Sequence, residues 1–219
     1  VKDKLTVKIF DSRAEMGKVA GEEAAAKIKE LIAKKGEVNM IFAAAPSQNE
    51  TLAHLLKQDI DWTKVRGFHQ DEYVGIDKSE PAGFGTFLDR AIFHKVPFME
   101  LHYLLCDKDH AEEKCEEYTE LLKKYPIDLI FLGIGENGHI AFNEPAPQLY
   151  SGTHVTDLTE STIKANSRFF EKIEDVPTKA LTMGIGSILK AKTIILLASG
   201  SSKKDVIKEL FKDKITTNV

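Results

Sequence analysis

The chain has 219 residues, of which 42% are hydrophobic and 29% are charged, and its formal net charge is −4 at pH 7. We expect a globular protein forming one domain over residues 1–219, because this length can bury a substantial core. The acidic balance argues against a nucleic-acid surface, the lack of a long apolar run argues against a membrane span, and two cysteines are typical of a cytoplasmic protein without disulfides.

Short apolar runs alternate with amphipathic stretches, which predicts βαβ units on a mostly parallel sheet. Residues 5–10 form the first predicted strand. Ser12 and Glu15 are spaced as a capping box, which predicts a helix that continues to about residue 35 and ends at Gly36. A buried strand over 38–45 and a helix over about 49–57 follow.

The third predicted strand, 65–69, leads into the turn His69-Gln-Asp-Glu-Tyr-Val-Gly75. Adjacent acids such as Asp71 and Glu72 are most often a solvated turn. Neighbouring side chains of an extended segment diverge, however, so one acid can face a ligand while the other supports the loop. Both interpretations stay open at this point.

A helix near 85–94, a short strand near 101–105 and a helix over 109–124 are predicted next. The strand 128–132 then presents Leu132-Gly-Ile-Gly-Glu-Asn-Gly-His-Ile-Ala-Phe-Asn-Glu-Pro145. Its glycines permit a sharp turn. Gly-x-Gly-x-x-Gly is also a dinucleotide-binding pattern, but that pattern opens a helix, which Pro145 and its neighbours interrupt.

His139 alone fits a structural histidine, but Glu144 lies five residues away, and a carboxylate can orient an imidazole and raise its basicity. Residues 150–176 are polar and irregular and are expected to cover the site. A helix over 178–189, a strand over 192–198 and a helix over 201–212 complete the expected elements.

Ligands of open α/β sheets usually bind at strand ends, so the two ionisable loops predict one shared site. A histidine with carboxylates is suited to proton transfer. The seven histidines show no metal-ligand spacing, so no metal site is expected.

Gly138 to Pro145 and Asp71-Glu-Tyr-Val-Gly75 resemble the glucosamine-6-phosphate deaminase (isomerase) family, which shares its architecture with the 6-phosphogluconolactonases. The resemblance implies a Rossmann-like three-layer α/β sandwich with a mostly parallel central sheet and a polar lid near 150–176. It implies conversion of glucosamine 6-phosphate to fructose 6-phosphate and ammonia, without a cofactor.

By the same resemblance, His139 opens the sugar ring with help from Glu144, and Asp71 moves a proton between C2 and C1. Asn137 stands where the family often has Asp, and a neutral amide can orient His139 but cannot stabilise an imidazolium as an anion does. Glu72 is expected to support the site, with a hydrogen bond to His139 as one option.

Arg168 matches a phosphate-contacting arginine of the family, and Lys203 lies where a loop enters the final helix. The family has a Gly/Thr-rich phosphate loop where this chain has Ala45-Pro-Ser-Gln-Asn-Glu50. Glu50 would repel phosphate if it pointed inward. The expected substrate-binding residues are Ser47, Gln48, Asn49, Glu72, Gly138, Arg168 and Lys203.

The expected partner is a phosphorylated amino sugar, and assembly into a homo-oligomer is left open. Hydrolase is among the classes expected, because ammonia leaves when the C2 imine is hydrolysed. Three alternatives stand beside this function: a galactosamine-6-phosphate deaminase, a 6-phosphogluconolactonase-type hydrolase, and a sugar-phosphate-binding protein without activity.

Overall fold

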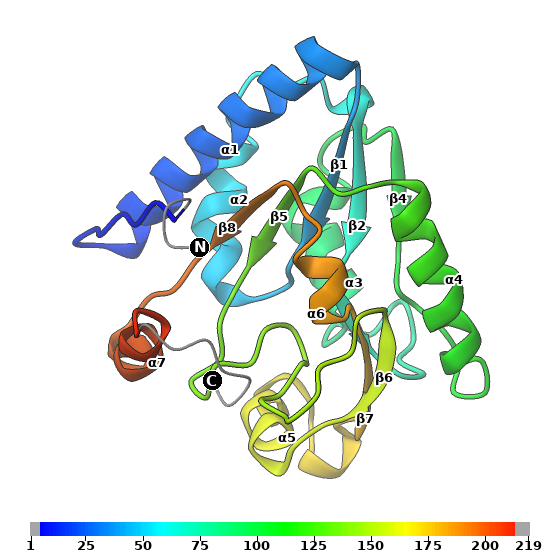
Figure 1. Ribbon diagram of the computed structural model, residues 1–219. Helices are drawn as coiled ribbons and strands as arrows, with labels where there is room; N and C mark the ends of the chain where they lie inside the picture. Colours follow the sequence, from blue (N-terminus) through cyan, green and yellow to red (C-terminus); the bar gives the residue numbers. More distant parts are fainter. Residues whose placement is uncertain (1–4, 213–219) are drawn as a thin grey trace.

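The computed structural model describes residues 5–212 and contains a central parallel sheet with a smaller antiparallel sheet below it in Figure 1. The central sheet has five strands in the order β4-β2-β1-β5-β8. Its strands are β1 (Val38–Phe42), β2 (Val65–His69), β4 (Glu100–His102), β5 (Leu129–Leu132) and β8 (Thr193–Leu196). This confirms the predicted α/β fold with a mostly parallel sheet.

Helices cover both faces of the central sheet, because its strands are apolar on both faces (Figure 1). In β1, Met40 and Phe42 pack toward one core, while Ile41 packs toward the other. The first core lies under α1 (Arg13–Lys35), α2 (Asn49–Leu55) and the helical segment of α3 (Phe84–Leu88) and η4 (Asp89–Phe93); the second lies under α4 (Ala111–Lys124) and α6 (Ile185–Ile188). The three layers are therefore helices, sheet and helices.

The ends of α1 follow the sequence signals. The Ser12 hydroxyl accepts a hydrogen bond from the Glu15 amide at 3.1 Å and caps the first turn. Gly36 adopts φ +86°, and its amide donates to the Ile32 carbonyl at 2.9 Å. Both predicted boundaries of this helix are confirmed.

Two predicted elements are wrong. Residues 5–10 form no strand, and Ile9 is 91% exposed, so the alternating apolar pattern there has no sheet to pack against within the described chain. Residues 178–189 are not one helix but β7 (Lys179–Thr182) followed by the short α6, because Gly184 separates them in an extended conformation.

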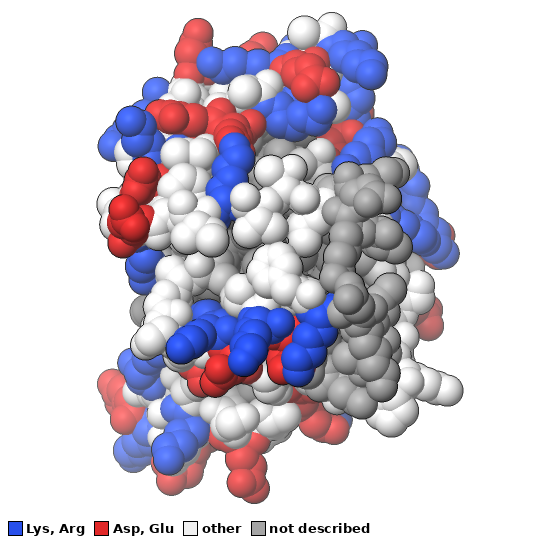
Figure 2. All heavy atoms as spheres, turned by 60° about the vertical axis from the view of Figure 1, so that its left-hand side comes forward, with Lys and Arg blue, Asp and Glu red and all other residues white. Residues whose placement is uncertain are grey.

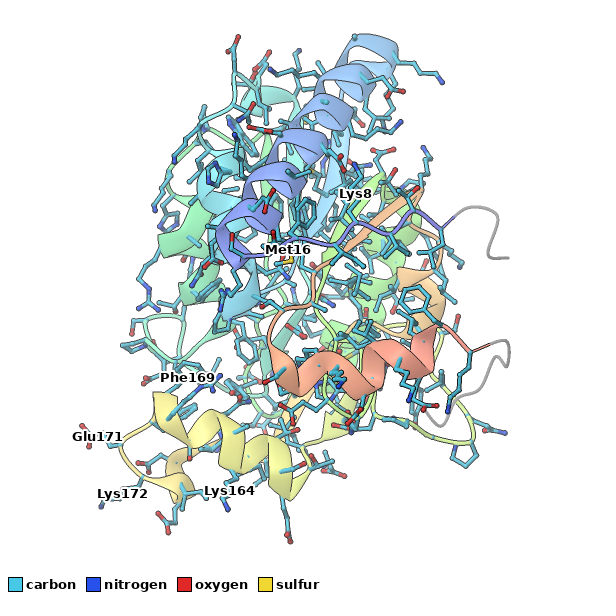
Figure 3. The ribbon with its side chains drawn as sticks, turned by 90° about the vertical axis from the view of Figure 1, so that its left-hand side faces the viewer. Lys8, Met16, Lys164, Phe169, Glu171 and Lys172 are labelled. Carbon is cyan, nitrogen blue, oxygen red and sulfur yellow. The ribbon has the colours of Figure 1, made fainter. Side chains whose placement is uncertain are left out.

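The predicted lid is more regular than expected. It contains β6 (His154–Asp157), α5 (Glu160–Asn166) and the 3-10 turns η5 (Ser167–Phe169) and η6 (Ile173–Asp175). β6 pairs with β7, and β7 pairs with β3 (Asp71–Tyr73), forming the antiparallel sheet β3-β7-β6. Figure 3 shows Lys164, Glu171 and Lys172 on the outer side of this segment, while Phe169 lies on its inner side.

Acidic and basic side chains are interspersed on the face shown in Figure 2, where lysines and arginines gather in a band across the lower half beside acidic neighbours. That face therefore offers no continuous basic surface of the kind that binds a nucleic-acid backbone. Among residues 5–212, no helix has the length and apolar character needed to cross a bilayer.

Candidate active site

The loops after β1 and β5 meet at the point where the strand order reverses. The chain runs outward from β1 to β2 and β4, and then returns to β5 on the other side of β1. Ligands of open α/β sheets bind in the crevice at such a switch point. The Ser47 hydroxyl lies 3.7 Å from the position that a Cβ would take at Gly133, so the two loops are in contact there.

The loop after β5 is compact and depends on two glycines. The Gly135 amide donates to the His139 carbonyl at 2.8 Å, and Gly138 adopts φ +91°, a left-handed conformation that glycine accepts without strain. A Cβ at Gly135 would lie 2.2 Å from ring atoms of His139. Only a glycine at 135 therefore leaves room for the imidazole.

Asn137 joins His139 to Glu144. Its Oδ1 lies 2.7 Å from His139 Nδ1 and also accepts from the His139 amide at 3.1 Å, while its Nδ2 donates to Glu144 at 2.6 Å. Because an amide oxygen only accepts, the neutral imidazole carries its proton on Nδ1, and Nε2 is left as the basic nitrogen. The Glu144 carboxylate lies 3.7 Å from the same Nδ1.

The pKa of His139 is lowered, chiefly because burial disfavours its charged form. The Glu144 carboxylate opposes this shift, whereas the positive charge of Lys203 adds to it. His139 is therefore neutral at pH 7 and can accept a proton. The same interaction places Lys203, in η7 (Ser201–Lys203), within electrostatic range of the imidazole.

Strand β7 connects this loop to Asp71. The Phe142 amide donates to the Thr182 hydroxyl at 3.1 Å, and Asn143 Nδ2 donates to the Met183 carbonyl at 2.7 Å. Thr182 is the register partner of Asp71 in the β3–β7 pair. The acidic turn and the histidine loop, which the sequence predicts to share one site, are therefore fixed to the same end of one strand.

Asp71 is half-buried, and its pKa is raised to about 7, first by burial and second by the neighbouring negative charge of Glu72. Glu72 is fully buried and accepts from the backbone amides of Tyr73, Phe84 and Gly85. The hydrogen bond from Glu72 to His139, which the sequence left as one option, is not among these contacts: the Glu72 carboxylate accepts from the three backbone amides.

Tyr73 is the centre of an aromatic cluster that joins the acidic strand to the lid. Its ring stacks on Phe84 at 4.7 Å and contacts Phe170 of the lid edge-on at 5.7 Å. Arg168 lies in η5, close in sequence to Phe170. Its guanidinium lies over the Phe169 ring at 4.7 Å, and its positive charge interacts with the Tyr73 hydroxyl. Arg168 therefore approaches the site from the lid side.

The loop between β1 and α2 turns Glu50 away from the strand ends. Glu50 accepts from the Arg13 guanidinium at 2.8 Å, and the same guanidinium donates to the Pro46 carbonyl at 2.7 Å. Gln48 is fully buried and donates to the Leu132 carbonyl at 3.3 Å, so its side chain supports the loop from behind, while Asn49 is exposed. The charge of Glu50, which would repel phosphate if it pointed inward, is thus paired with Arg13.

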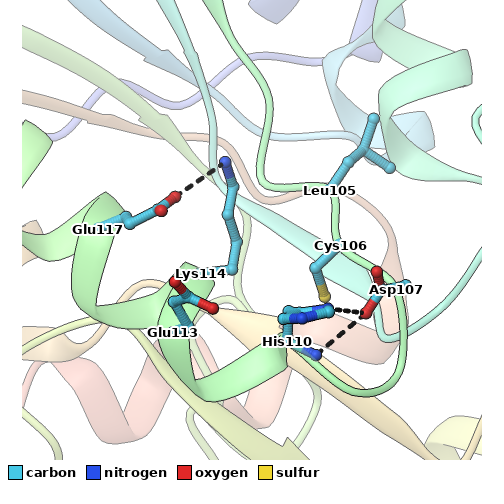
Figure 4. Close-up of a pocket in the computed structure, with 7 residues that line it drawn as sticks. All are labelled: Leu105, Cys106, Asp107, His110, Glu113, Lys114 and Glu117. Atoms are coloured by element: carbon cyan, nitrogen blue, oxygen red, sulfur yellow. Dashed lines mark hydrogen bonds and ion pairs between the residues drawn. The ribbon is translucent and has the colours of Figure 1, made fainter.

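A hollow beside α4, away from these loops, is a poor candidate for a phosphate site (Figure 4). Its ionisable groups pair with one another: His110 Nδ1 lies 2.7 Å from Asp107, and Lys114 lies 3.7 Å from Glu117. The hollow carries more acidic than basic side chains; it is lined by Leu105, Cys106, Asp107, His110, Glu113, Lys114 and Glu117. No group of three potential metal ligands occurs in residues 5–212.

Comparison with known proteins decides the family. The model of the family glucosamine-6-phosphate isomerases/6-phosphogluconolactonase matches residues 11–218. The chain belongs to this family.

Relatives within the glucosamine-6-phosphate isomerase family are similar along most of their length. A glucosamine-6-phosphate deaminase of Listeria welshimeri is 46% identical over 202 residues, covering 92% of this chain and 86% of the relative. One of Streptococcus pneumoniae serotype 4 is 41% identical over 209 residues, covering 95% and 88%. A solved monomeric glucosamine-6-phosphate deaminase has a TM-score of 0.88 at 30% identity, covering 98% of this chain and 90% of that chain.

These comparisons overturn the expected hydrolase class. The relatives at 41–46% identity are named as deaminases. A 6-phosphogluconolactonase from Shewanella baltica, covering 96% of this chain and 88% of its own, has a TM-score of 0.76 at only 18% identity, which shows the fold alone. The names of these relatives therefore do not support a hydrolase class for this chain.

The sequence did not identify three residues that hold the site together. Thr182 lies in a segment predicted to be helical, so its pairing with Asp71 had no local signal. Asn143 lies within the segment that resembles the family, where a buried amide beside a proton-transfer pair is a recognisable anchor. Tyr73 was read as part of the acidic turn, and its role appears only when the lid is in place.

Proposed function

We propose that the protein is a glucosamine-6-phosphate deaminase. The observation that carries the proposal is the connection of Asp71, whose pKa is about 7, to the His139–Asn137–Glu144 chain through Thr182 of β7. The family and the deaminases that resemble this chain support the same activity. Asp71, His139, Asn137 and Glu144 form the proposed proton-transfer set.

His139 opens the sugar ring. Its unprotonated Nε2 takes the proton of the anomeric hydroxyl and returns a proton to the ring oxygen as the C1–O5 bond breaks. Asn137 fixes the tautomer that makes this possible, and the Glu144 carboxylate 3.7 Å from Nδ1 stabilises the imidazolium that forms transiently.

Asp71 carries out the isomerisation. Its carboxylate removes the proton from C2 of the open-chain amino sugar as O1 takes a proton from the ammonium group of the substrate, which gives an enolamine. The Asp71 carboxyl then delivers its proton to C1, which leaves an iminium group at C2. Water then adds to C2 and ammonia leaves, giving fructose 6-phosphate. A carboxyl with a pKa of about 7 is suited to both taking and returning a proton near neutral pH.

Phosphate binding is assigned to the cations and donors around the switch point. Lys203 acts electrostatically on His139 from one side, and Arg168 approaches Tyr73 from the lid. Ser47 lies at the meeting of the two loops, and Asn49 begins α2 on the exposed side. Glu72, Gln48 and Gly138 shape the site from behind: the Gly138 amide donates within its own loop to Gly135 at 3.2 Å.

The experiment is a measurement of ammonia and fructose 6-phosphate released in equal amounts from glucosamine 6-phosphate. Galactosamine 6-phosphate and 6-phosphogluconolactone are tested in parallel, and the Asp71→Asn variant serves as the inactive control. Binding of glucosamine 6-phosphate without release of either product would overturn the proposal.

We also propose that the protein works in the cytoplasm. Its cysteines support a reducing compartment, since Cys106 and Cys115 are both free thiols. Cell fractionation of the native protein is the check.

A further inference from the structure

The adjacent acids Asp71 and Glu72 have different surroundings, although both belong to β3. Successive side chains of a strand point to opposite faces. Asp71 is partly open to solvent and faces the site, whereas Glu72 is 0% exposed and faces α3. The two carboxyls can therefore differ in protonation while lying next to each other in the chain.

The Glu72 side chain caps the start of α3, although α3 begins twelve residues later in the sequence. Its Oε1 accepts from the Phe84 amide at 3.1 Å and the Tyr73 amide at 2.9 Å, and its Oε2 accepts from the Gly85 amide at 2.7 Å. Phe84 and Gly85 are the first residues of α3, where amides have no partner within the helix. Gly85 also leaves room for the carboxylate, because a Cβ there would lie 3.3 Å from Oε2.

A buried histidine faces the same carboxylate. The Leu104 amide donates to His69 Nδ1 at 3.4 Å, so the proton of the neutral ring lies on Nε2. Nε2 has no hydrogen-bond partner and lies 3.8 Å from Glu72 Oε2. The positive end of this N–H dipole points to the Glu72 carboxylate, as do the three amides.

We propose that Glu72 is a positioning residue that stays ionised at neutral pH, and that its fixed charge makes Asp71 the carboxyl of the pair that binds and releases a proton. Three backbone donors favour the anionic form of Glu72, because a carboxylate accepts stronger hydrogen bonds than a neutral carboxyl does. Within the described chain, no such donors bind the Asp71 carboxylate. The proposal deepens the deaminase function and rests on it for the role of Asp71 as the base.

The other titratable groups around the pair do not change charge near pH 7. Burial lowers the pKa of His69 to about 3. Burial raises the pKa values of the Tyr73 and Tyr118 hydroxyls and of the Cys106 thiol, and the carboxylates of the pair add to each shift. Burial also raises the pKa of Glu72, and its three backbone hydrogen bonds oppose that rise.

The test is a titration of the Asp71 and Glu72 carboxyl carbons by ¹³C NMR in the wild-type chain and in Glu72→Gln. In the wild type, Asp71 is expected to titrate near pH 7, and Glu72 is expected to lose its proton at a lower pH than Asp71 does. Glu72→Gln is expected to lower the Asp71 midpoint by about one pH unit, because a nearby negative charge is removed. The Asp71→Asn variant assigns the signal.

Glu80→Gln is the matched control, since it removes a carboxylate from the segment between β3 and α3, where its side chain accepts from the Ala82 amide at 3.5 Å, and its Asp71 midpoint should equal that of the wild type. Titration of Glu72 near pH 7 in the wild type, or an unchanged Asp71 midpoint in a folded Glu72→Gln variant, would overturn the proposal. The wild-type titration gives a decision even when Glu72→Gln does not fold.

The NMR midpoints do not require turnover, so they separate this proposal from the proposed function. Absence of ammonia release counts against the deaminase function, whereas the midpoints alone decide the role of Glu72. Where the enzyme turns over, the acidic limb of its kcat/KM profile should move with the Asp71 midpoint, while a purely structural role would lower kcat/KM equally at every pH.

Discussion

Asn137 Oδ1 lies 2.7 Å from Nδ1 of His139, so the base of the proposed ring opening is oriented by an amide and not by an acid. We expect Asn137→Leu to lower kcat by about 10- to 100-fold, a loss typical of removing the partner that fixes a functional histidine. Steady-state measurement of ammonia release checks this.

Asn137→Asp is the informative companion variant. It keeps an acceptor for Nδ1 but places a second negative charge near Glu144, which accepts from Asn137 Nδ2 at 2.6 Å. The added charge should raise the pKa of His139 and move the acidic limb of the rate profile to higher pH. Equal activity of the Leu and wild-type enzymes would show that the tautomer is fixed by another group.

Asp71→Asn should abolish turnover and stabilise the fold. We expect kcat to fall by about 10³-fold or more, because the base for C2 is lost. The pKa of Asp71 is raised in the folded state, so its contribution to stability is fully present below its unfolded pKa of 3.8 and is lost as the pH rises through about 7.

The stability change therefore depends on pH. At pH 8 the free energy of unfolding of Asp71→Asn should exceed that of the wild type by about 1 to 3 kcal/mol. This value is reduced to allow for the solvent access of Asp71. The gain should be small at pH 4. Denaturant unfolding at both pH values measures it, and a gain that does not increase with pH would contradict the raised pKa.

Arg13 should protect the phosphate-binding loop from the charge of Glu50. The pair is 2.8 Å apart and partly exposed. We expect Arg13→Leu to raise KM for glucosamine 6-phosphate about two- to five-fold, with kcat unchanged, because the freed carboxylate repels phosphate. The double variant Arg13→Leu with Glu50→Gln should restore KM; a KM that stays high would assign the effect to loop shape.

The central sheet was predictable because its signals are local. Leu129 to Leu132 is apolar at every position and is followed by a glycine-rich turn, and both ends of α1 carry capping residues. The antiparallel sheet was not predictable, because β3 has only three residues and pairs with β7 more than a hundred residues later. A three-residue strand has too few side chains to show a period.

The candidate site divides in the same way, into residues that lie close together in the sequence and residues that depend on distant segments. His139, Asn137 and Glu144 lie within one loop and are joined by a chain of hydrogen bonds, and the catalytic roles expected of them stay predictions. The partners of Glu72 were not predictable, because Phe84 and Gly85 belong to the start of a helix that no local pattern relates to β3.

The opposite end of β5 depends on a buried charge. Asp128 is 0% exposed and accepts from Lys35 at 2.5 Å, Lys192 at 3.0 Å and the Asn39 amide at 2.9 Å. Burial alone would raise its pKa, but these hydrogen bonds lower it below its ordinary value. Its stabilisation is therefore present above its unfolded pKa and is lost as the pH falls through the lower folded value.

Asp128→Asn should therefore destabilise the protein by about 2 to 4 kcal/mol at pH 7, because two ammonium groups lose the charge that they share. The difference from the wild type should shrink below about pH 4, where the Asp128 carboxyl of the unfolded wild-type chain begins to bind a proton. Asp109→Asn, at an exposed position before α4, is the control and should unfold with the wild-type midpoint. Chemical denaturation at pH 7 and pH 3.5 measures both variants. A difference that stays constant between these pH values would mean that the packing of Asp128, and not its charge, stabilises this end of the sheet.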